Sequence, residues 1–297
     1  HTSSEERGQI YVPEINALLM VVCIGLVLTL RSSNRLAAAY GVAVVGAMTI
    51  TSLLLFVVMR RRWQWPLPVV LIPVSLFLLV DVTFLWAAMQ KIADGGWFPL
   101  VVGFMTYEIM STWKRGRTAL GKWLAESSLP LTRFLESFAR QTDICRVKGT
   151  AVFMTSNPRG TPVVLMHHLK HNKVMHERVI LLSVNSSEEI PEIPADQRVE
   201  IKELGQGFYQ VFAYYAFMQT PNVPEIFRRC EKKGLEGNVS EASFYLGRET
   251  LIITKRKGMM RWRKTLFAFL SRNALSATAY FGIPPNRVVE LGAQVEL

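Results

Sequence analysis

The first residue that could do chemistry is Asp81, a carboxylate inside an otherwise uncharged apolar run, SLFLLVDVTFLWAAM. A carboxylate can bind a cation or carry a proton. If the run is a membrane helix, an ionisable group at this depth is costly and faces protein or water rather than lipid. Asp81 is therefore a candidate functional carboxylate. A structural carboxylate, hydrogen-bonded to a neighbouring helix, is the alternative.

Tyr40 is the second candidate, a single tyrosine within SSNRLAAAYGVAVVGAMTIT, which otherwise consists mostly of small and aliphatic residues. It lies about five residues in from the end of a predicted helix, or roughly 7 Å at the usual rise per residue. A tyrosine at that depth either belongs to an interfacial aromatic belt or faces a pathway between helices. The sequence leaves both interpretations open.

A histidine-rich stretch, HHLKHNKVMHE, suggests a metal site because His167 and His171 are four residues apart and share one helical face. Zinc sites need three or four ligands in a closed shell, and the neighbouring sequence offers no cysteine or convincing acidic partner. No nucleophile elbow, P-loop or dinucleotide fingerprint stands in the strand–turn–helix context that it requires. We therefore expect no metal, no cofactor and no enzymatic activity.

Tyr40 and Asp81 must be positioned by the apolar segments that contain them. Four such segments follow one another, at about residues 15–30, 36–59, 67–89 and 97–112. A helix needs about 20 apolar residues to cross a bilayer, so the sequence predicts an α-helical polytopic membrane domain over residues 15–113. The positive loops RRRW and KRGR favour the cytoplasmic side. Residues 1–14 are then a cytoplasmic stub, and the chain beyond residue 113 is a cytoplasmic tail.

The second apolar segment carries unusually little bulk. Helices in lipid associate by close packing rather than by hydrophobic exclusion, so small residues mark their contact faces. We expect this helix to be enclosed by neighbours on several sides. The predicted packing residues are Ala39, Gly41, Ala43, Gly46 and Ala47.

The tail is predicted to contain an amphipathic linker, residues 114–148, and a small α/β domain, residues 149–297. GTAVFMTS and RVILLSVN are typical of buried strands with a helix between them. RVEIKELGQGFYQVFAYY predicts a hairpin that turns at Gly205–Gly207, and PNVPEIFRRCEKKG predicts a helix that ends at glycine. ASFYLGRETLIITK predicts two further strands.

Nearly all of the net charge of +11 belongs to the tail. Nucleic acid could attract such charge, but a tail attached to a membrane domain favours anionic lipid as the partner. KRKGMMRWRKTLFAFL places basic residues ahead of an apolar helical face, as interfacial helices do. The lipid-docking candidates are Lys255, Arg256, Lys257, Arg261 and Arg263. Packing of this helix against the α/β domain is the alternative.

Several of these stretches occur together, in order, in one family. GQIYVPEIN, SSNRLAAAYGVAVVGAM, LLVDVTFLWAAMQKIADGGWFP and STWKRGR resemble the last four membrane helices of the Kup/HAK/KT potassium uptake permeases. The tail resembles them in HHLKHNKVMHERVILLSV, TPNVPEIF and PPNRVVELGAQVEL. The resemblance covers essentially the whole chain.

The resemblance implies a twelve-span transporter of the LeuT-like, amino acid–polyamine–organocation architecture, of which this chain is a fragment without the first eight helices. It implies uptake of K⁺, commonly with H⁺, by alternating access in the bacterial inner membrane. Tyr40 matches the tyrosine of the family's AAAYG motif, and its phenol oxygen could ligate a hard cation. Asp81 matches the family's VD carboxylate, which lies on a peripheral helix. Val45 and Ala47 replace residues that are often threonine, which puts a polar role there in doubt.

Two other functions remain open from the sequence. The spans could anchor a cytoplasmic sensor or interaction module, with the tail carrying the activity. In the transporter, the cytoplasmic domain is instead expected to regulate transport or to form a homodimer. A transporter of amino acids on the same architecture would leave the same pattern. An intramembrane carboxylate beside a small-residue helix favours a transporter over an anchor.

Overall fold

The computed structural model describes residues 2–3, 5, 8–141, 144–187, 190–235, 237–254 and 258–296. The chain forms two compact units. One comprises Val12–Ser111, and the other comprises the chain from Thr112 onward together with its first residues. The helices and strands are α1 (Pro13–Leu30), α2 (Ser33–Arg61), α3 (Leu67–Met89), η1 (Ile92–Gly96), α4 (Trp97–Glu126), α5 (Leu131–Ala139), β1 (Cys145–Met154), α6 (Val163–Asn172), β2 (Val174–Ser187), β3 (Val199–Gly205), β4 (Phe208–Ala216), α7 (Val223–Lys232), β5 (Ser243–Ile252), α8 (Arg261–Arg272), α9 (Ala277–Tyr280), η2 (Pro285–Arg287) and β6 (Val288–Glu296).

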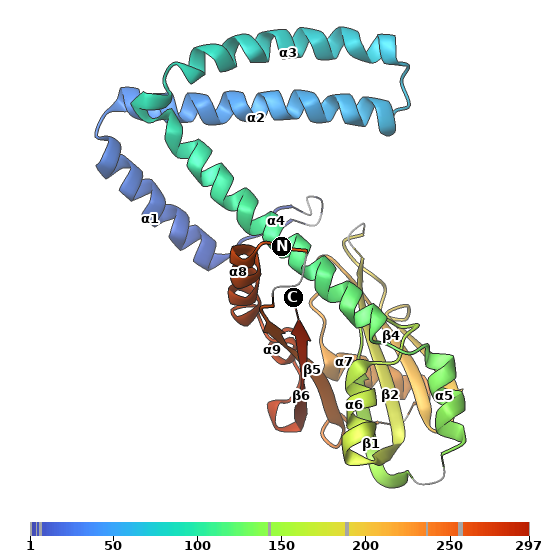
Figure 1. Ribbon diagram of the computed structural model, residues 1–297. Coiled ribbons are helices and arrows are strands. Elements are labelled where there is room, and N and C mark those ends of the chain that lie inside the picture. Colours follow the sequence, from blue (N-terminus) through green and yellow to red (C-terminus); the bar gives the residue numbers. More distant parts are fainter. Residues whose placement is uncertain are drawn as a thin grey trace. The chain divides into compact units, whose positions relative to one another are not determined.

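The first unit is helical. α1, α2 and α3 are long and apolar enough to cross a membrane by length and composition, and they coincide with the first three predicted spans. α2 and α3 lie side by side (Figure 1), with Met59, Val70 and Val74 buried where the short loop between them returns the chain. The unit therefore presents a helical hairpin with one contact seam.

The fourth predicted span differs from the other three. Within the described residues, α4 is not among the helices that meet the same length and composition criteria. It also continues without interruption from Trp97 to Glu126, well past the predicted end at residue 112. The stretch predicted as a linker is thus mostly helical, formed by the second half of α4 and by α5. A fourth span remains a prediction.

The second unit is built on a six-stranded sheet with the order β3-β4-β2-β1-β5-β6. β3 runs antiparallel to β4, and every other neighbouring pair is parallel. Side chains alternate along β1, so that Phe153 joins one apolar cluster with α5 and α6 while Val152 joins another with α7. Helices cover both faces of the sheet, as parallel strands require.

The predicted β–α–β unit, the hairpin and α7 are all confirmed. The hairpin turns at Gly205, Gln206 and Gly207, which all have positive φ, a conformation that glycine adopts without strain. α7 begins after Asn222, whose side chain accepts a hydrogen bond from the Glu225 amide, and Gly234 follows its end with φ 87°. Local sequence signals were sufficient for these elements.

The prediction of two strands in ASFYLGRETLIITK is wrong, because β5 is one continuous strand. Its first part pairs with β1, and it pairs with β6 from Phe244 to Ile252. Gly247 does not mark a turn. A Cβ there would lie 2.9 Å from Val164 Cγ2, so the glycine allows α6 to approach the strand. β6 was not predicted, and β1 begins at Cys145 rather than near residue 149.

α8 packs against the second half of α4. The Phe267 ring lies 5.6 Å from the Trp113 ring, between centroids, and it occupies the space that a Cβ at Gly116 would need. Lys264 is 2% exposed, and its ammonium donates a hydrogen bond to the Thr254 carbonyl. Part of the helix that was predicted to dock on lipid is therefore inside the protein.

Candidate functional site

Asp81 lies at the contact between α3 and α2. Its carboxylate is buried, with 4% of the residue exposed, and its Oδ2 accepts a hydrogen bond of 2.5 Å from the Ser52 hydroxyl. A carboxylate that is costly to bury in lipid thus finds a donor on the neighbouring helix. The geometry favours the structural reading, in which the Ser52–Asp81 hydrogen bond ties α2 to α3.

The turn between α3 and α4 is fitted against the start of α2. Gly95 has φ 133°, and a Cβ on it would lie 2.7 Å from the carbonyl oxygen of Arg35. A Cβ on Gly96 would lie 2.7 Å from Val42 Cγ2. Both glycines therefore allow the close approach to α2, and Gly95 also adopts a backbone conformation that other residues rarely adopt.

One face of α2 makes these contacts, through Ala38, Ala39 and Val42, which are all buried. The other predicted packing residues are less covered within the described part of the chain. Ala43 and Ala47 are exposed, and a Cβ on Gly41 or Gly46 would have nothing within 4 Å. The structure shows enclosure of α2 on one side; enclosure on several sides remains a prediction.

Tyr40 belongs to the uncovered face. It is 72% exposed, and Ala43 and Ala47 follow it three and seven residues later, a spacing that places all three on one stripe of the helix. Ser52 lies twelve residues further along α2, or about 18 Å at the helical rise per residue. The structure therefore does not bring Tyr40 and Asp81 into one site.

Ser52 was missed at the level of sequence. The signal was a hydroxyl within the apolar run TITSLLLF, since serine and threonine in membrane helices often bond across to a neighbour. Its partner could not be named without knowing which face of α3 carries Asp81.

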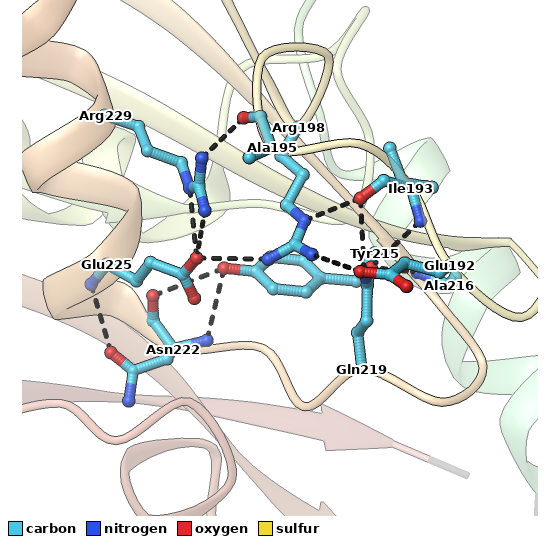
Figure 2. A network of polar contacts seen from close by, with 10 residues as sticks. All are labelled: Glu192, Ile193, Ala195, Arg198, Tyr215, Ala216, Gln219, Asn222, Glu225 and Arg229. Carbon is cyan, nitrogen blue, oxygen red and sulfur yellow. Dashed lines mark hydrogen bonds and ion pairs between the residues drawn. The ribbon is translucent and has the colours of Figure 1, made fainter.

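The α/β domain holds a second polar cluster, shown in Figure 2, that joins the loop before β3 to α7. The Glu225 carboxylate accepts hydrogen bonds from Arg198, at 3.1 Å, and from Arg229 Nε, at 3.0 Å. Arg198 also donates to the Ile193 carbonyl, and Arg229 to the Ala195 carbonyl. Partial burial raises the pKa of Glu225, but the hydrogen bonds and charges of the two arginines outweigh it and hold the pKa below its usual value. These charges are satisfied within the chain, and the cluster serves to hold the loop.

The histidines of the predicted metal stretch do not gather into one site. His167 and His171 face each other on α6 with ring centroids 6.2 Å apart. Among the described residues, no three histidine, cysteine or acidic side chains gather as a metal site would need. His168, by contrast, is buried against Tyr245, and burial followed by the charge of His176 lowers its pKa.

The predicted lipid-docking residues differ in their exposure. Lys255, Arg256 and Lys257 lie outside the described residues. Arg261 is exposed at the start of α8, whereas Arg263 is 6% exposed and places its guanidinium 5.0 Å from the centre of the Trp262 ring. Arg263 is therefore not on the outer face of α8.

Comparison with known proteins gives matches along almost the whole chain. Residues 1–118 match the family model described as the K+ potassium transporter integral membrane domain, and residues 148–297 match that of the K+ potassium transporter C-terminal domain. Proteins named "Probable potassium transport system protein Kup" are 54% identical in Myxococcus xanthus and 50% identical, as Kup 2, in Chromobacterium violaceum. Each aligns with 100% of this chain, which spans 45% and 48% of their respective lengths. The chain thus spans about half the length of the curated relatives it matches.

Proposed function

The chain belongs to the K⁺ potassium transporter family, and from that premise we propose that it forms part of a permease that takes up K⁺, with H⁺ as the coupled ion. The match of residues 1–118 to the family's integral membrane domain is the observation that carries the proposal. The family is one of transporters rather than enzymes, and α1 to α3 are long and apolar enough to span a membrane.

We place α1 to α4 as the last four helices of a twelve-span, LeuT-like transporter that works by alternating access in the bacterial inner membrane. Such architectures bind their substrate near the midplane, between helices of two repeats. The one-sided packing of α2 supports a position at that boundary, because one face meets α3 and η1 while the Tyr40 face is left for other helices.

Tyr40 is the ion-pathway residue that we propose on this face. Its phenol oxygen is a hard ligand of the kind that K⁺ prefers, and the small side chains of Ala43 and Ala47 beside it leave room for a permeating ion. Asp81 acts through the Ser52 hydrogen bond, by fixing α3 against α2. The two residues have separate roles in this proposal.

We place the tail in the cytoplasm, where α8 would contact anionic lipid. The exposed face of α8 carries Arg261, Trp262 and Phe269, a combination of charge and aromatic surface that suits a membrane interface. Hydrogen exchange of α8 in nanodiscs measures this contact. Anionic lipid should protect Met260 to Thr265 more than zwitterionic lipid does; equal protection would contradict it.

Uptake into proteoliposomes tests the function itself. The complete open reading frame that contains this chain should support K⁺ uptake that increases when the external side is acidified. Amino acids in excess should not compete. Amino-acid uptake without K⁺ uptake would instead favour the other transporter of this architecture, and no uptake of either would favour a membrane-anchored sensor.

A further inference from the structure

A groove lies between α5 and α6 on one face of the sheet. The two helices join the same apolar cluster, but they rest on different strands. On α5, the Phe134 and Phe138 rings meet Phe208 at the start of β4, at centroid distances of 6.0 and 5.1 Å. On α6, the His168 ring lies 4.5 Å from that of Tyr245 on β5. Because β2 and β1 stand between β4 and β5 in the sheet, a gap is left between the two helices over these strands.

The spacing of the strands sets the width of this groove. Three strand intervals of about 4.8 Å separate β4 from β5, which places the helices about 14 Å apart. Directly packed helices lie about 8–10 Å apart, and a third helix between two others would need about 16–20 Å. The groove is therefore too wide to be closed by its own helices and too narrow for another helix, but it accommodates a single extended chain.

The inner surface of the groove is apolar. Phe134, Phe138, Met166 and Leu169 line it from the two helices, and Ile144 lines it directly ahead of β1. Ile144, Met166 and Leu169 are only half-buried, so part of their apolar surface is left uncovered by the described chain. The cavity has a volume of about 780 Å³, inside the range of about 300–1,000 Å³ that is usual for small-molecule sites. These properties suit a ligand with an apolar chain.

Cationic side chains border this apolar surface. Arg133 lies on the α5 wall, and Lys170 and Lys173 lie on the α6 wall, at the end of that helix. All three are exposed, and among the described residues their side chains have no hydrogen-bond or ion-pair partner. None of the described residues that line the groove is acidic. The border of the groove therefore attracts an anion that the described chain does not itself supply.

We propose that this groove binds a free long-chain fatty acid. The acyl chain lies between α5 and α6, and the carboxylate pairs with Lys170 and Lys173, while Arg133 adds positive potential from the opposite wall. The width of the groove favours one acyl chain over the two chains of a phospholipid and over the helix of an acidic peptide. The proposal concerns the tail alone and does not depend on which ion the membrane domain transports.

Photo-crosslinking in nanodiscs tests the site, with palmitic acid that carries a diazirine at the end of its chain as the probe. The purified full chain is held in phosphatidylcholine, which has no net charge and offers no competing anion. Illumination should label α5 and α6, and labelling of α1 to α3 by probe dissolved in the bilayer gives the internal reference. Unlabelled palmitate in excess should remove most of the label on α5 and α6. Methyl palmitate, which keeps the chain but lacks the charge, should leave it nearly unchanged.

Two variants disturb the groove without changing a buried side chain. Lys170→Gln together with Lys173→Gln should lower the labelling of α5 and α6 by about three- to tenfold, the effect expected for two exposed ion pairs. Ser137→Glu adds a carboxylate to the α5 wall and should lower the labelling through repulsion of the fatty acid carboxylate.

Each variant has a matched control. Lys202→Gln together with Lys232→Gln removes two exposed charges elsewhere, on β3 and α7, and Thr132→Glu adds a carboxylate on α5 outside the groove. Both controls should be labelled like the wild type. Melting curves should show that every variant is folded, because all the substituted positions are exposed.

Three results would overturn the proposal. The first is equal competition by palmitate and methyl palmitate, and the second is wild-type labelling of the variant that lacks Lys170 and Lys173. The third is loss of the label on α5 and α6, relative to that on α1 to α3, when phosphatidylglycerol replaces phosphatidylcholine. Lipid headgroups of the membrane, rather than a free fatty acid, would then occupy the groove.

Discussion

The helical unit and the α/β domain achieve close packing by opposite means. In the helical unit, the start of α2 meets the turn between α3 and α4 through small residues such as Ala38 and Ala39, and Gly95 and Gly96 fit where a Cβ would lie 2.7 Å from another atom. In the α/β domain, large side chains such as Phe153 and Phe244 are fully buried in the two cores. Lipid gives helices no hydrophobic reason to associate, so the first unit depends on shape and the second on apolar area.

The two regions also handle buried charge differently. Between α2 and α3, the Asp81 carboxylate accepts a short hydrogen bond from the Ser52 hydroxyl. Around α7, Glu225 is held by two arginines that are themselves bonded to carbonyl groups (Figure 2). We therefore expect the helical unit to be sensitive to added volume and to loss of one donor, and the α/β domain to be sensitive to lost volume.

Phe153→Ala should have the largest effect. Phe153 is fully buried and stacks on Tyr245 with ring centroids 4.9 Å apart, so truncation should lower the free energy of unfolding of the α/β domain by about 3–5 kcal/mol. Differential scanning fluorimetry or chemical unfolding measures the change. Leu275→Ala, at a site that is 71% exposed, is the control and should have little effect.

Gly95→Val tests the helical unit by adding side-chain volume instead of removing it. The added side chain meets the Arg35 carbonyl and a positive φ, so we expect a cost of at least about 1–3 kcal/mol from backbone strain alone. Gly103→Val on α4, where a Cβ meets nothing within 4 Å, is the matched control. Thermal unfolding in detergent should distinguish the two variants. Equal stability of both would contradict a shape-dependent contact between η1 and α2.

Ser52→Ala should destabilise the α2–α3 contact by about 1–3 kcal/mol, because it leaves the Asp81 carboxylate buried without its donor. Replacing both partners, with Ser52→Ala and Asp81→Leu together, should restore much of this loss, since two apolar groups need no hydrogen bond. A double-mutant cycle on thermal unfolding measures the coupling. If the double variant is folded but inactive in transport, Asp81 has a role in the ion pathway after all.

Glu225→Gln should have a smaller effect that depends on pH. The folded-state pKa of Glu225 is lowered, so its ion pairs stabilise the domain above the unfolded-state pKa, and this contribution disappears as the pH falls through the folded-state pKa. The group is partly exposed and screened, so we expect about 1 kcal/mol at neutral pH. Melting curves of wild type and variant should converge in acid. A constant difference at all pH values would show that the charge is not the cause.

The sequence predicts most of the elements that local signals define. Apolar runs of membrane length mark α1 to α3, and Gly205–Gly207 marks the hairpin. The strand β6 and the unbroken course of β5 depend instead on pairing between segments some 40 residues apart, which periodicity does not report. Parallel strands buried on both faces also lack the alternation that identifies strands.

For the candidate sites too, the sequence identified single residues but not their partners. Residue type and apolar context identified Asp81 and Tyr40, but only the three-dimensional arrangement shows Ser52 as the partner of Asp81 and the stripe that Tyr40 shares with Ala43 and Ala47.

The most direct test of K⁺ transport along the open face of α2 is K⁺ uptake by Tyr40 variants of the complete open reading frame that contains this chain. Uptake rates in proteoliposomes should fall at least severalfold in Tyr40→Ala, in protein that remains folded by its melting curve. Tyr40→Phe should separate the hydroxyl from the ring, with a similar loss if the phenol oxygen contacts the ion. Wild-type uptake in both variants would contradict the placement of Tyr40 on the ion pathway.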